Sequence, residues 1–317
     1  MTHAPSLHRR CAGRDVQSPQ AVHRPAQHRL AFALTLAGLA SFALIPVDRA
    51  ALGQTLPAGL NVVQGRAGVA VQGNQMTVTN SAGAVLNWQS FSIGAGGGVH
   101  FEQPSAASRV LNRVVGSDPS QIFGSLTSNG QVWLVNPYGV LFGRDARVDV
   151  GSLVVSTLAI GNDDWRAGNL RFAAASGDPG APLVNQGELR TTTGGHVLLL
   201  GGSGGVRNDG LIAAPDGQVA LAAGRSVELV DSGLPRIAVR VQAPQGEALN
   251  LGRIAVAGGR VDLAAAMVNQ QGIVQADAVA GNGGQIELRA SERVTLGSGS
   301  ATSARSSASA GTPRRRG

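Results

Sequence analysis

The sequence predicts an all-β protein whose main part is a parallel β-helix, a solenoid of stacked strand rungs. A repeat with Gly and Asn corners is typical of such a solenoid. A chain with 45 Gly and 3% aromatic residues also suits thin, repetitive packing. Four segments share an apolar residue, a polar or Asn position, a Gly corner and an alternating strand: VNQGELRT (184–191), VRNDGLIAA (206–214), LNLGRIAVA (249–257) and VNQQGIVQA (268–276).

The corner glycines of these segments indicate the length of one rung. Gly187, Gly210, Gly252 and Gly272 are separated by 23, 42 and 20 residues. We interpret the interval of 42 as two units of 21. A second series begins with Gly, one further residue and a period-2 strand: GGHVLLL (194–200), GQVALAA (217–223), GRVDLAA (259–265) and GQIELRA (284–290). Such alternation predicts short strands entered through turns, so rungs are expected over about 180–297.

The first part of the chain predicts an extended secretory signal over residues 1–53. The apolar stretch LAFALTLAGLASFALI (30–45) follows a basic segment and precedes small residues ending at Gly53, which places cleavage before Gln54. A membrane anchor is the alternative, but the stretch has 16 residues, whereas a spanning helix needs about 20. The one cysteine, Cys11, lies in this segment, so the predicted mature chain contains no disulfide.

Residues 54–172 predict the cap that the first rung requires, because an open strand edge must be covered. All aromatic residues of the predicted mature chain fall in this part. Strands are expected at 76–80 and 130–136, with turns at 81–83 and 128–130. The cap and its motifs take up about 60–172, and we expect the cap to add antiparallel strands to the solenoid.

The last part of the chain breaks the strand pattern. After Gly297 the alternation stops, and Ser, Ala and Arg dominate the remaining residues. Such a composition has no apolar pattern to bury, so residues 298–317 are predicted to be a disordered tail. The abrupt change suggests an interrupted reading frame or a fragment boundary.

The net charge of +7 comes from the two ends of the chain. Every basic residue is Arg, and ten of the 26 lie before residue 54 or after residue 300. Between these points acids and bases nearly cancel. A groove that neutralises phosphates needs clustered positive charge. The folded part is therefore not expected to bind nucleic acid.

The sequence predicts no catalytic residue, no metal site and no cofactor. The Gly runs at 94–98 and 201–205 lack the Lys of a phosphate-binding loop and are interpreted as corners. His100 and His196 are interpreted as exposed strand residues, since a zinc site needs several converging ligands. Asp163-Asp164 is interpreted as part of a solvated loop rather than a calcium site.

A polysaccharide-active β-helix hydrolase or lyase is the enzymatic alternative. Glycoside hydrolysis needs two carboxyl groups about 5–9 Å apart, which on a solenoid means the same position on neighbouring rungs. Glu188, Asp209 and Asp216 are the candidates. They occupy corner-like positions, where polar residues are expected in any case.

Residues 87–158 carry a series of motifs in a fixed order: NWQSF (87–91), FEQP (101–104), LNRV (111–114), SQIFG (120–124), NPYG (136–139) and STL (156–158). The segment resembles, almost throughout, the amino-terminal secretion domain, or haemagglutination activity domain, of filamentous-haemagglutinin-like two-partner-secretion exoproteins. With its flanks from about residue 60, the resemblance covers more than a third of the chain.

The resemblance implies a right-handed β-helix at about 54–300 and a route of export. The general secretory machinery would carry the chain into the periplasm of a Gram-negative bacterium. POTRA modules of a dedicated outer-membrane barrel transporter would then recognise the domain and export it to the cell surface or the medium. The residues that match motifs associated with this recognition are Asn112, Arg113, Asn136, Pro137, Tyr138 and Gly139.

The turn at 136–139 departs from the family at one position. Family members usually read Asn-Pro-Asn-Gly, whereas this chain has Tyr138, and a second family turn, Asn-Pro-Asn-Leu, has no counterpart. Pro137 sets φ for the first central position, Gly139 follows without steric cost, and the Asn136 side chain can bond its own backbone two residues on. The turn can nucleate the fold or contact the transporter, and the sequence leaves both roles open.

The sequence is therefore interpreted as a non-enzymatic, secreted β-solenoid of the adhesin, haemagglutinin or haemolysin type. In full-length relatives such a domain precedes an adhesive, haemolytic or toxic passenger, which would engage a host cell surface or glycan. This chain is expected to be a truncated form without that passenger.

Overall fold

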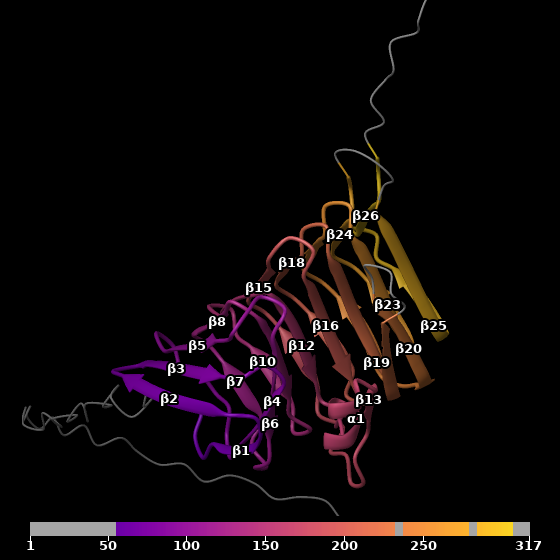
Figure 1. Cartoon of the computed structure of the whole chain (residues 1–317). Helices are drawn as coiled ribbons and strands as arrows, with labels where there is room; N and C mark the ends of the chain where they lie inside the picture. The colour runs from indigo at the N-terminus through magenta and orange to yellow at the C-terminus, as the bar shows by residue number, and fades with distance from the viewer. Residues whose placement is uncertain (1–54, 232–236, 279–283, 307–317) are drawn as a thin grey trace, which may run out of the picture. The chain divides into compact units, whose positions relative to one another are not determined.

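The computed structural model describes residues 55–231, 237–278 and 284–306 (Figure 1). The predicted signal over 1–53 and the cleavage pair Gly53 and Gln54 lie outside these ranges. Within them, no helix is long and apolar enough to cross a membrane. The described chain consists of strands and turns, with one short helix in these ranges, α1 (Asn162–Ala167).

The cap at the beginning of the solenoid contains the predicted antiparallel strands. β1 (Asn61–Gln64) pairs antiparallel with β4 (Ala84–Trp88), and β2 (Ala67–Gln72) pairs antiparallel with β3 (Gln75–Asn80). β3 and β4 then pair in parallel with the first strands of the rungs. The cap thus begins with antiparallel strand pairs, and its strands β3 and β4 continue into the parallel columns of the rungs.

The rungs stack as three columns of parallel strands, which run from the indigo cap to the yellow end in Figure 1. The first column is β4, β6 (Arg109–Val114), β9 (Gln131–Val135), β12 (Ser152–Ser156), β16 (His196–Gly201), β19 (Gln218–Asp231), β23 (Arg260–Gln270) and β25 (Gln285–Leu296). The second is β7 (Ser120–Ile122), β10 (Val140–Phe142), β14 (Leu183–Asn185), β17 (Val206–Asn208), β21 (Glu247–Asn250) and the end of β23.

The third column is β3, β5 (Gly98–Glu102), β8 (Ser125–Ser128), β11 (Arg147–Val150), β15 (Glu188–Thr191), β18 (Leu211–Ala213), β22 (Arg253–Ala255), β24 (Ile273–Gln275) and β26 (Ala301–Ser303). All four predicted repeat segments begin in the second column and continue in the third. The prediction of a parallel β-helix is confirmed.

Inward-facing side chains stack in lines along the solenoid axis. One line runs through the first column, where each residue lies beside the next in register: Val110, Val132, Leu153, Val197, Val219 and Val261. Each of these residues has no exposed surface. Alternate residues of most column strands thus form a continuous apolar core inside the rungs.

The glycine corners bring the backbone of one rung directly onto the next. A Cβ atom on Gly210 would lie 2.1 Å from the carbonyl oxygen of Gly187, and a Cβ atom on Gly252 would lie 2.1 Å from that of Gly210. Gly272 meets Gly252 in the same way, at 2.1 Å. Only glycine permits so close an approach.

The interpretation of the 42-residue interval as two rungs is wrong. Gly252 stacks on Gly210 without a rung between them, because β17 pairs with β21 and β18 pairs with β22. The additional residues form a hairpin that leaves the solenoid. It consists of the second half of β19 and the antiparallel strand β20 (Ile237–Pro244).

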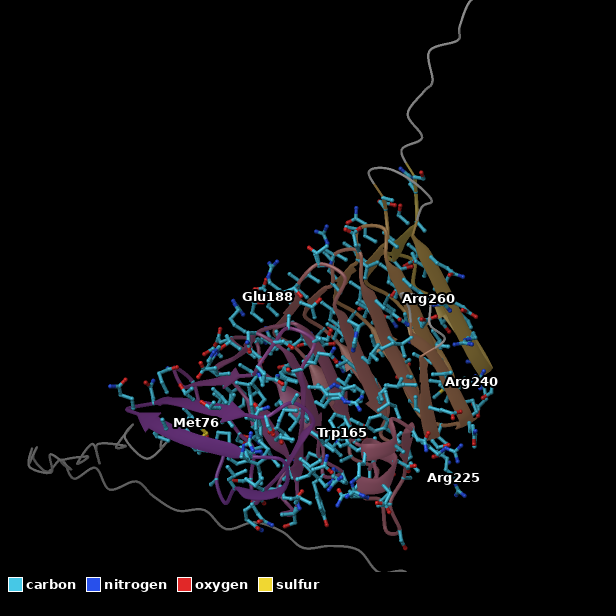
Figure 2. All side chains as sticks on the ribbon, in the orientation of Figure 1. Met76, Trp165, Glu188, Arg225, Arg240 and Arg260 are labelled. Atoms are coloured by element: carbon cyan, nitrogen blue, oxygen red, sulfur yellow. The ribbon has the colours of Figure 1, made fainter. Side chains whose placement is uncertain are left out.

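This hairpin belongs to a second layer outside the first column. β13 (Leu170–Ala173) pairs antiparallel with the second half of β19, and α1 precedes it. These elements cover a second apolar cluster that includes Leu111, Trp133 and Leu198 of the first column and Phe172 of β13. Trp165 of α1, labelled in Figure 2, packs edge-on against Trp133 with ring centroids 5.1 Å apart. This layer was not predicted from the sequence.

A ladder of buried amide side chains runs through the second column. Asn185 Nδ2 donates to Asn208 Oδ1 at 2.8 Å, and Asn208 Nδ2 donates to Asn250 Oδ1 at 2.8 Å. Asn250 Nδ2 donates to Gln270 Oε1 at 2.7 Å. All four side chains have no exposed surface. In the same line toward the cap, the register places Phe142 and Ile122 instead.

The first residues of the predicted tail, 298–306, are described by the structure and include a strand. β26 pairs in parallel with β24, and Ala276 N–H donates to Ser303 O at 2.7 Å. Asp277 Oδ1 then accepts from Arg305 N–H at 2.7 Å. A short polar strand can join an existing edge through backbone hydrogen bonds, which composition does not reveal. The prediction of disorder is thus wrong up to residue 306, while residues 307–317 lie outside the described ranges.

Of His100 and His196, one is an exposed strand residue, as expected, and the other is not. His100 is exposed, and its Nδ1 shares a hydrogen bond with Thr127 Oγ1 at 2.9 Å. His196 is half-buried, and its Nε2 is shielded from solvent without a hydrogen-bond partner in the described part of the chain. Burial lowers the pKa of the His196 imidazole to about 4. The expectation for His196 was wrong because the outer layer covers its strand.

We expect Asn208→Ala to lower the free energy of unfolding by about 2–4 kcal/mol, because Asn185 Nδ2 and Asn250 Oδ1 lose their buried partner. Asn269→Ala is the matched control, since Asn269 is only half-buried and stands outside the ladder. Its effect should stay within about 0.5 kcal/mol. Chemical denaturation measures both variants, and equal losses would contradict the stabilising role of the ladder.

Candidate functional site

The turn Asn136–Gly139 joins β9 of the first column to β10 of the second. Asn136 Oδ1 accepts from Tyr138 N–H at 2.9 Å, and Asn136 O accepts from Gly139 N–H at 3.1 Å. The side chain of Asn136 therefore bonds its own backbone two residues on, as predicted. Gly139 has a φ of +105°, a region that favours glycine, and a Cβ atom there would lie 3.2 Å from Pro182 O.

Asn136 also ties the turn to its surroundings. Its Nδ2 donates to Asp118 O at 2.9 Å and to Ser120 Oγ at 3.0 Å. Its backbone N–H donates to Ser156 O at 2.9 Å. The residue has no exposed surface, so its polar groups are engaged entirely within the chain. Asn136 thus links the ends of β9 and β12 to the segment that enters β7.

The outer surface of the turn is formed mainly by Tyr138. This residue is 44% exposed, whereas Pro137 is half-buried and Gly139 is buried. A partner that touches the folded turn would therefore meet the Tyr138 ring and one side of Pro137. Tyr138 is also the position at which this chain departs from the usual Asn of the motif.

Asn112 lies inside the solenoid, on the strand next to β9. Its Oδ1 accepts from Trp88 Nε1 at 2.9 Å, and its Nδ2 donates to Trp133 O at 3.3 Å. The residue has no exposed surface. In the folded chain it links β4 of the cap to β9 and is out of reach of a partner.

Arg113 points to the other side of β6 and holds the outer layer. Its Nη2 donates to Ile160 O at 2.7 Å, and its Nη1 donates to Asn162 Oδ1 at 2.9 Å. Burial lowers the pKa of its guanidinium. The register places Arg113 beside Val135, one residue before Asn136, so the structure brings all the predicted recognition residues to one end of neighbouring strands.

Two serines also contact Asn136, and they were not predicted from the sequence as residues of this site. Ser120 stands 16 residues before Asn136 and bonds its side chain, while Ser156 accepts from its backbone. Both lie in motifs noted in the sequence, SQIFG and STL. The motifs were visible, but their contact with the turn depends on how the rungs stack.

Two of the three carboxylates considered for catalysis are engaged by arginines. Glu188 lies at the outer edge of the molecule (Figure 2) and forms ion pairs with Arg147, at 3.2 Å, and with Arg190. Asp209 pairs with Arg207 at 2.7 Å. Asp216 occupies a corner with a φ of +53°. The described ranges also hold no cluster of three or more His, Cys, Asp or Glu side chains able to bind a metal ion.

Comparison with known proteins points to one family. The family model described as TPS secretion domain, where TPS stands for two-partner secretion, matches residues 53–314. The crystal structure of the HMW1 secretion domain from Haemophilus influenzae is similar, with a TM-score of 0.74 and 36% sequence identity. That similarity covers 79% of this chain and 67% of the solved chain.

Two heme/hemopexin-binding proteins of Haemophilus influenzae are similar in sequence. One, from strain Rd, is 34% identical over 176 residues, which cover 46% of this chain and 19% of that protein. The other is 41% identical over 85 residues, which cover 26% of this chain and 9% of that protein. The matched region thus spans about a fifth or less of these curated relatives.

We expect Asn136→Ala to lower the free energy of unfolding by about 2–4 kcal/mol, because it removes three hydrogen bonds of a buried amide. Tyr138→Ala, at the exposed position of the same turn, should change it by less than about 0.5 kcal/mol. Denaturant titration of the purified variants gives both values. If Tyr138→Ala lowers the free energy of unfolding as much as Asn136→Ala does, the conclusion that Asn136 stabilises the turn and Tyr138 does not would be wrong.

Proposed function

The chain belongs to the family of TPS secretion domains, and we propose that its β-helix directs the export of an exoprotein by a dedicated partner transporter. Membership in the family implies a transporter in the outer membrane and export to the cell surface or the medium. The observation that carries the proposal is the family match over 53–314, which takes in every described strand.

In this proposal, export has two stages. The signal over 1–53 directs the chain to the general secretory machinery and is removed between Gly53 and Gln54. The mature chain then enters the periplasm of a Gram-negative bacterium, where POTRA modules of the transporter recognise it. The predicted mature chain contains no cysteine, so an oxidising periplasm cannot lock it with disulfides before the second crossing.

We assign the Asn136–Gly139 turn a structural role in recognition. The buried contacts of Asn136 join the end of β9 to β7 and β12, and Asn112 and Arg113 reinforce the same region from the neighbouring strand β6. These residues are then required because they shape the surface that the transporter binds. Tyr138 is not required in this proposal, although it is the most exposed residue of the turn.

Adhesion is assigned to a passenger rather than to the secretion domain. Binding of a host cell surface or glycan would belong to such a passenger in longer members of the family. We further propose that the domain is not an enzyme. The ion pairs of Glu188 and Asp209 with arginines support this over the polysaccharide-active alternative, which requires two carboxyl groups facing one substrate.

Secretion of the full chain, measured in cells with and without its outer-membrane transporter, tests the proposal. We expect release to require the transporter. Asn136→Ala should reduce release several-fold, and Tyr138→Ala should leave it unchanged. Quantification of the chain in the medium and in the periplasm gives these results.

Asn208→Ala serves as the matched control for stability. It is expected to destabilise the chain about as much as Asn136→Ala does, but it lies away from the turn. If Asn208→Ala is released about as well as the wild type, the lower release of Asn136→Ala is due to the changed surface around the turn and not to lower stability in general. Release without the transporter would overturn the proposed function, and loss of release in Tyr138→Ala alone would overturn the structural role of the turn.

A further inference from the structure

A cleft of about 550 Å³ lies over the beginning of the first-column strands, on their outer face. Its lining includes Arg109 of β6, Gln131 and Trp133 of β9, Leu170 of β13, His196 of β16 and Ile237 of β20. A cleft of this size matches those that hold small molecules in proteins. It lies apart from the Asn136–Gly139 turn, which follows the opposite end of β9.

Two polar atoms of the lining residues are buried and have no partner within the described ranges. They are the indole Nε1 of Trp133 and the imidazole Nε2 of His196. Buried polar groups in folded proteins nearly always have a partner, so each exception needs a physical explanation. Both residues line one cleft, but the two atoms are themselves shielded from a water-sized probe, so a ligand that supplies the missing hydrogen bonds reaches them when the side chains that cover them turn aside.

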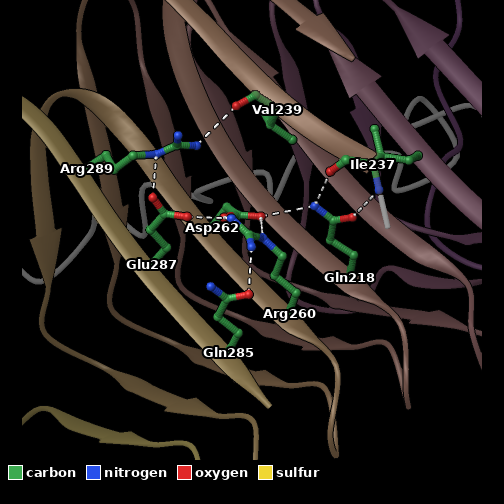
Figure 3. A network of polar contacts seen from close by, with 8 residues as sticks. All are labelled: Gln218, Ile237, Val239, Arg260, Asp262, Gln285, Glu287 and Arg289. Atoms are coloured by element: carbon green, nitrogen blue, oxygen red, sulfur yellow. Dashed lines mark hydrogen bonds and ion pairs between the residues drawn. The ribbon is translucent and has the colours of Figure 1, made fainter. Parts of the chain in front are cut away.

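The chain cannot readily satisfy these two atoms itself. Trp133 is held between Phe172, whose ring stacks at 6.0 Å, and Trp165, whose ring lies edge-on at 5.1 Å. The residue beside His196 on the next strand is Gln218, and its amide is already engaged. Figure 3 shows Gln218 bonded to both backbone polar groups of Ile237, at 2.8 and 2.9 Å, and to Asp262 at 3.0 Å.

The charge of the lining is positive. Among the described residues, Arg109 and His196 are the ionisable ones in its lining, and none of the described lining residues carries a carboxylate. The Arg109 guanidinium lies 4.3 Å from the centre of the Trp165 ring, and it forms no ion pair within the described ranges. Burial lowers the pKa of Arg109, which indicates a partly desolvated cation. Such a cation binds an anion more strongly than one in water does.

The two ends of the cleft are separated along the sheet. Arg109 and His196 stand three strands apart in the order β6, β9, β12, β16. Strands in a sheet are about 4.8 Å apart, so the positions are separated by roughly 14 Å. The apolar side chains of Leu170 and Ile237 also line the cleft. A matching molecule therefore has an anionic end, an apolar middle and a polar far end.

We propose that this cleft binds an elongated, amphipathic small-molecule carboxylate. The carboxylate accepts hydrogen bonds from Arg109 and Trp133 Nε1, the chain packs on Leu170 and Ile237, and a second polar group bonds His196 Nε2. Binding is independent of export, so failure of one proposal leaves the other intact.

Isothermal titration calorimetry on the purified full chain tests the site with three probes of equal chain length. The probes are 10-hydroxydecanoate, decanoate without the far hydroxyl, and 1,10-decanediol without the carboxylate. We expect saturable binding of the hydroxy acid, which should bind more tightly than either of the other probes. Equal affinity of all three probes would overturn the proposed polar contacts.

Two variants test which end of the ligand contacts Arg109 and which end contacts His196. Arg109→Gln should weaken binding of both carboxylates about ten-fold and leave the diol unaffected. His196→Leu should weaken the hydroxy acid about five-fold and leave decanoate unaffected. Effects on all three probes alike, or on none, would contradict the assignment.

A third variant tests the cleft without touching its polar groups. Ala107 is exposed and lines the cleft, whereas its exposed neighbour Ala106 does not line it. Ala107→Phe should block binding of the hydroxy acid, and Ala106→Phe should preserve it. Thermal unfolding of all variants confirms that they are folded. Binding that survives Ala107→Phe, or no saturable binding to the wild type, would overturn the proposal.

Discussion

Contact of backbone on backbone at the glycine corners is the constraint on which the rest of the structure depends. Gly187, Gly210, Gly252 and Gly272 form one line of corners, each close enough to the next to exclude a Cβ atom. This contact lets neighbouring rungs stay at hydrogen-bonding distance while the chain changes direction. The ladder from Asn185 to Gln270 and the apolar lines of the core can form only when the corners are in register.

Stacking leaves two surfaces that must be covered, and the cap and the outer layer cover them. A stack of rungs leaves an open edge, and the antiparallel strands β1 and β2 begin the stack there. The outer face of the first column carries large apolar side chains, including Trp133, and the second layer covers them. Asn112 bonds Trp88 of the cap and Arg113 bonds the segment that begins the outer layer, whereas Asn136 ties the end of β9 to β7 and β12.

Much of this architecture could be predicted from local patterns. The four repeat segments identified strands and corners correctly, because a Gly corner and a period-2 strand are features of neighbouring residues. The hydrogen bond of Asn136 to its own backbone was predictable for the same reason. The family resemblance supplied the identity of the domain, which composition alone could not.

The errors concern partners that lie far apart in the sequence. The 42-residue interval between Gly210 and Gly252 contains a hairpin, and only the pairing of β17 with β21 distinguishes it from an additional rung. β26 is ordered through backbone bonds to β24, which a Ser- and Ala-rich composition does not reveal. The burial of His196 and the contact between Ser120 and Asn136 likewise follow from stacking.

The stability of Gly210→Ala, compared with that of Gly68→Ala, tests the central claim most directly. A Cβ atom on Gly210 would lie 2.1 Å from a carbonyl oxygen of the next rung, whereas one on Gly68 in β2 would meet nothing within 4 Å. The account predicts that Gly210→Ala lowers the free energy of unfolding by about 3 kcal/mol and that Gly68→Ala leaves it unchanged or slightly higher. A Gly210→Ala chain as stable as the wild type would contradict it.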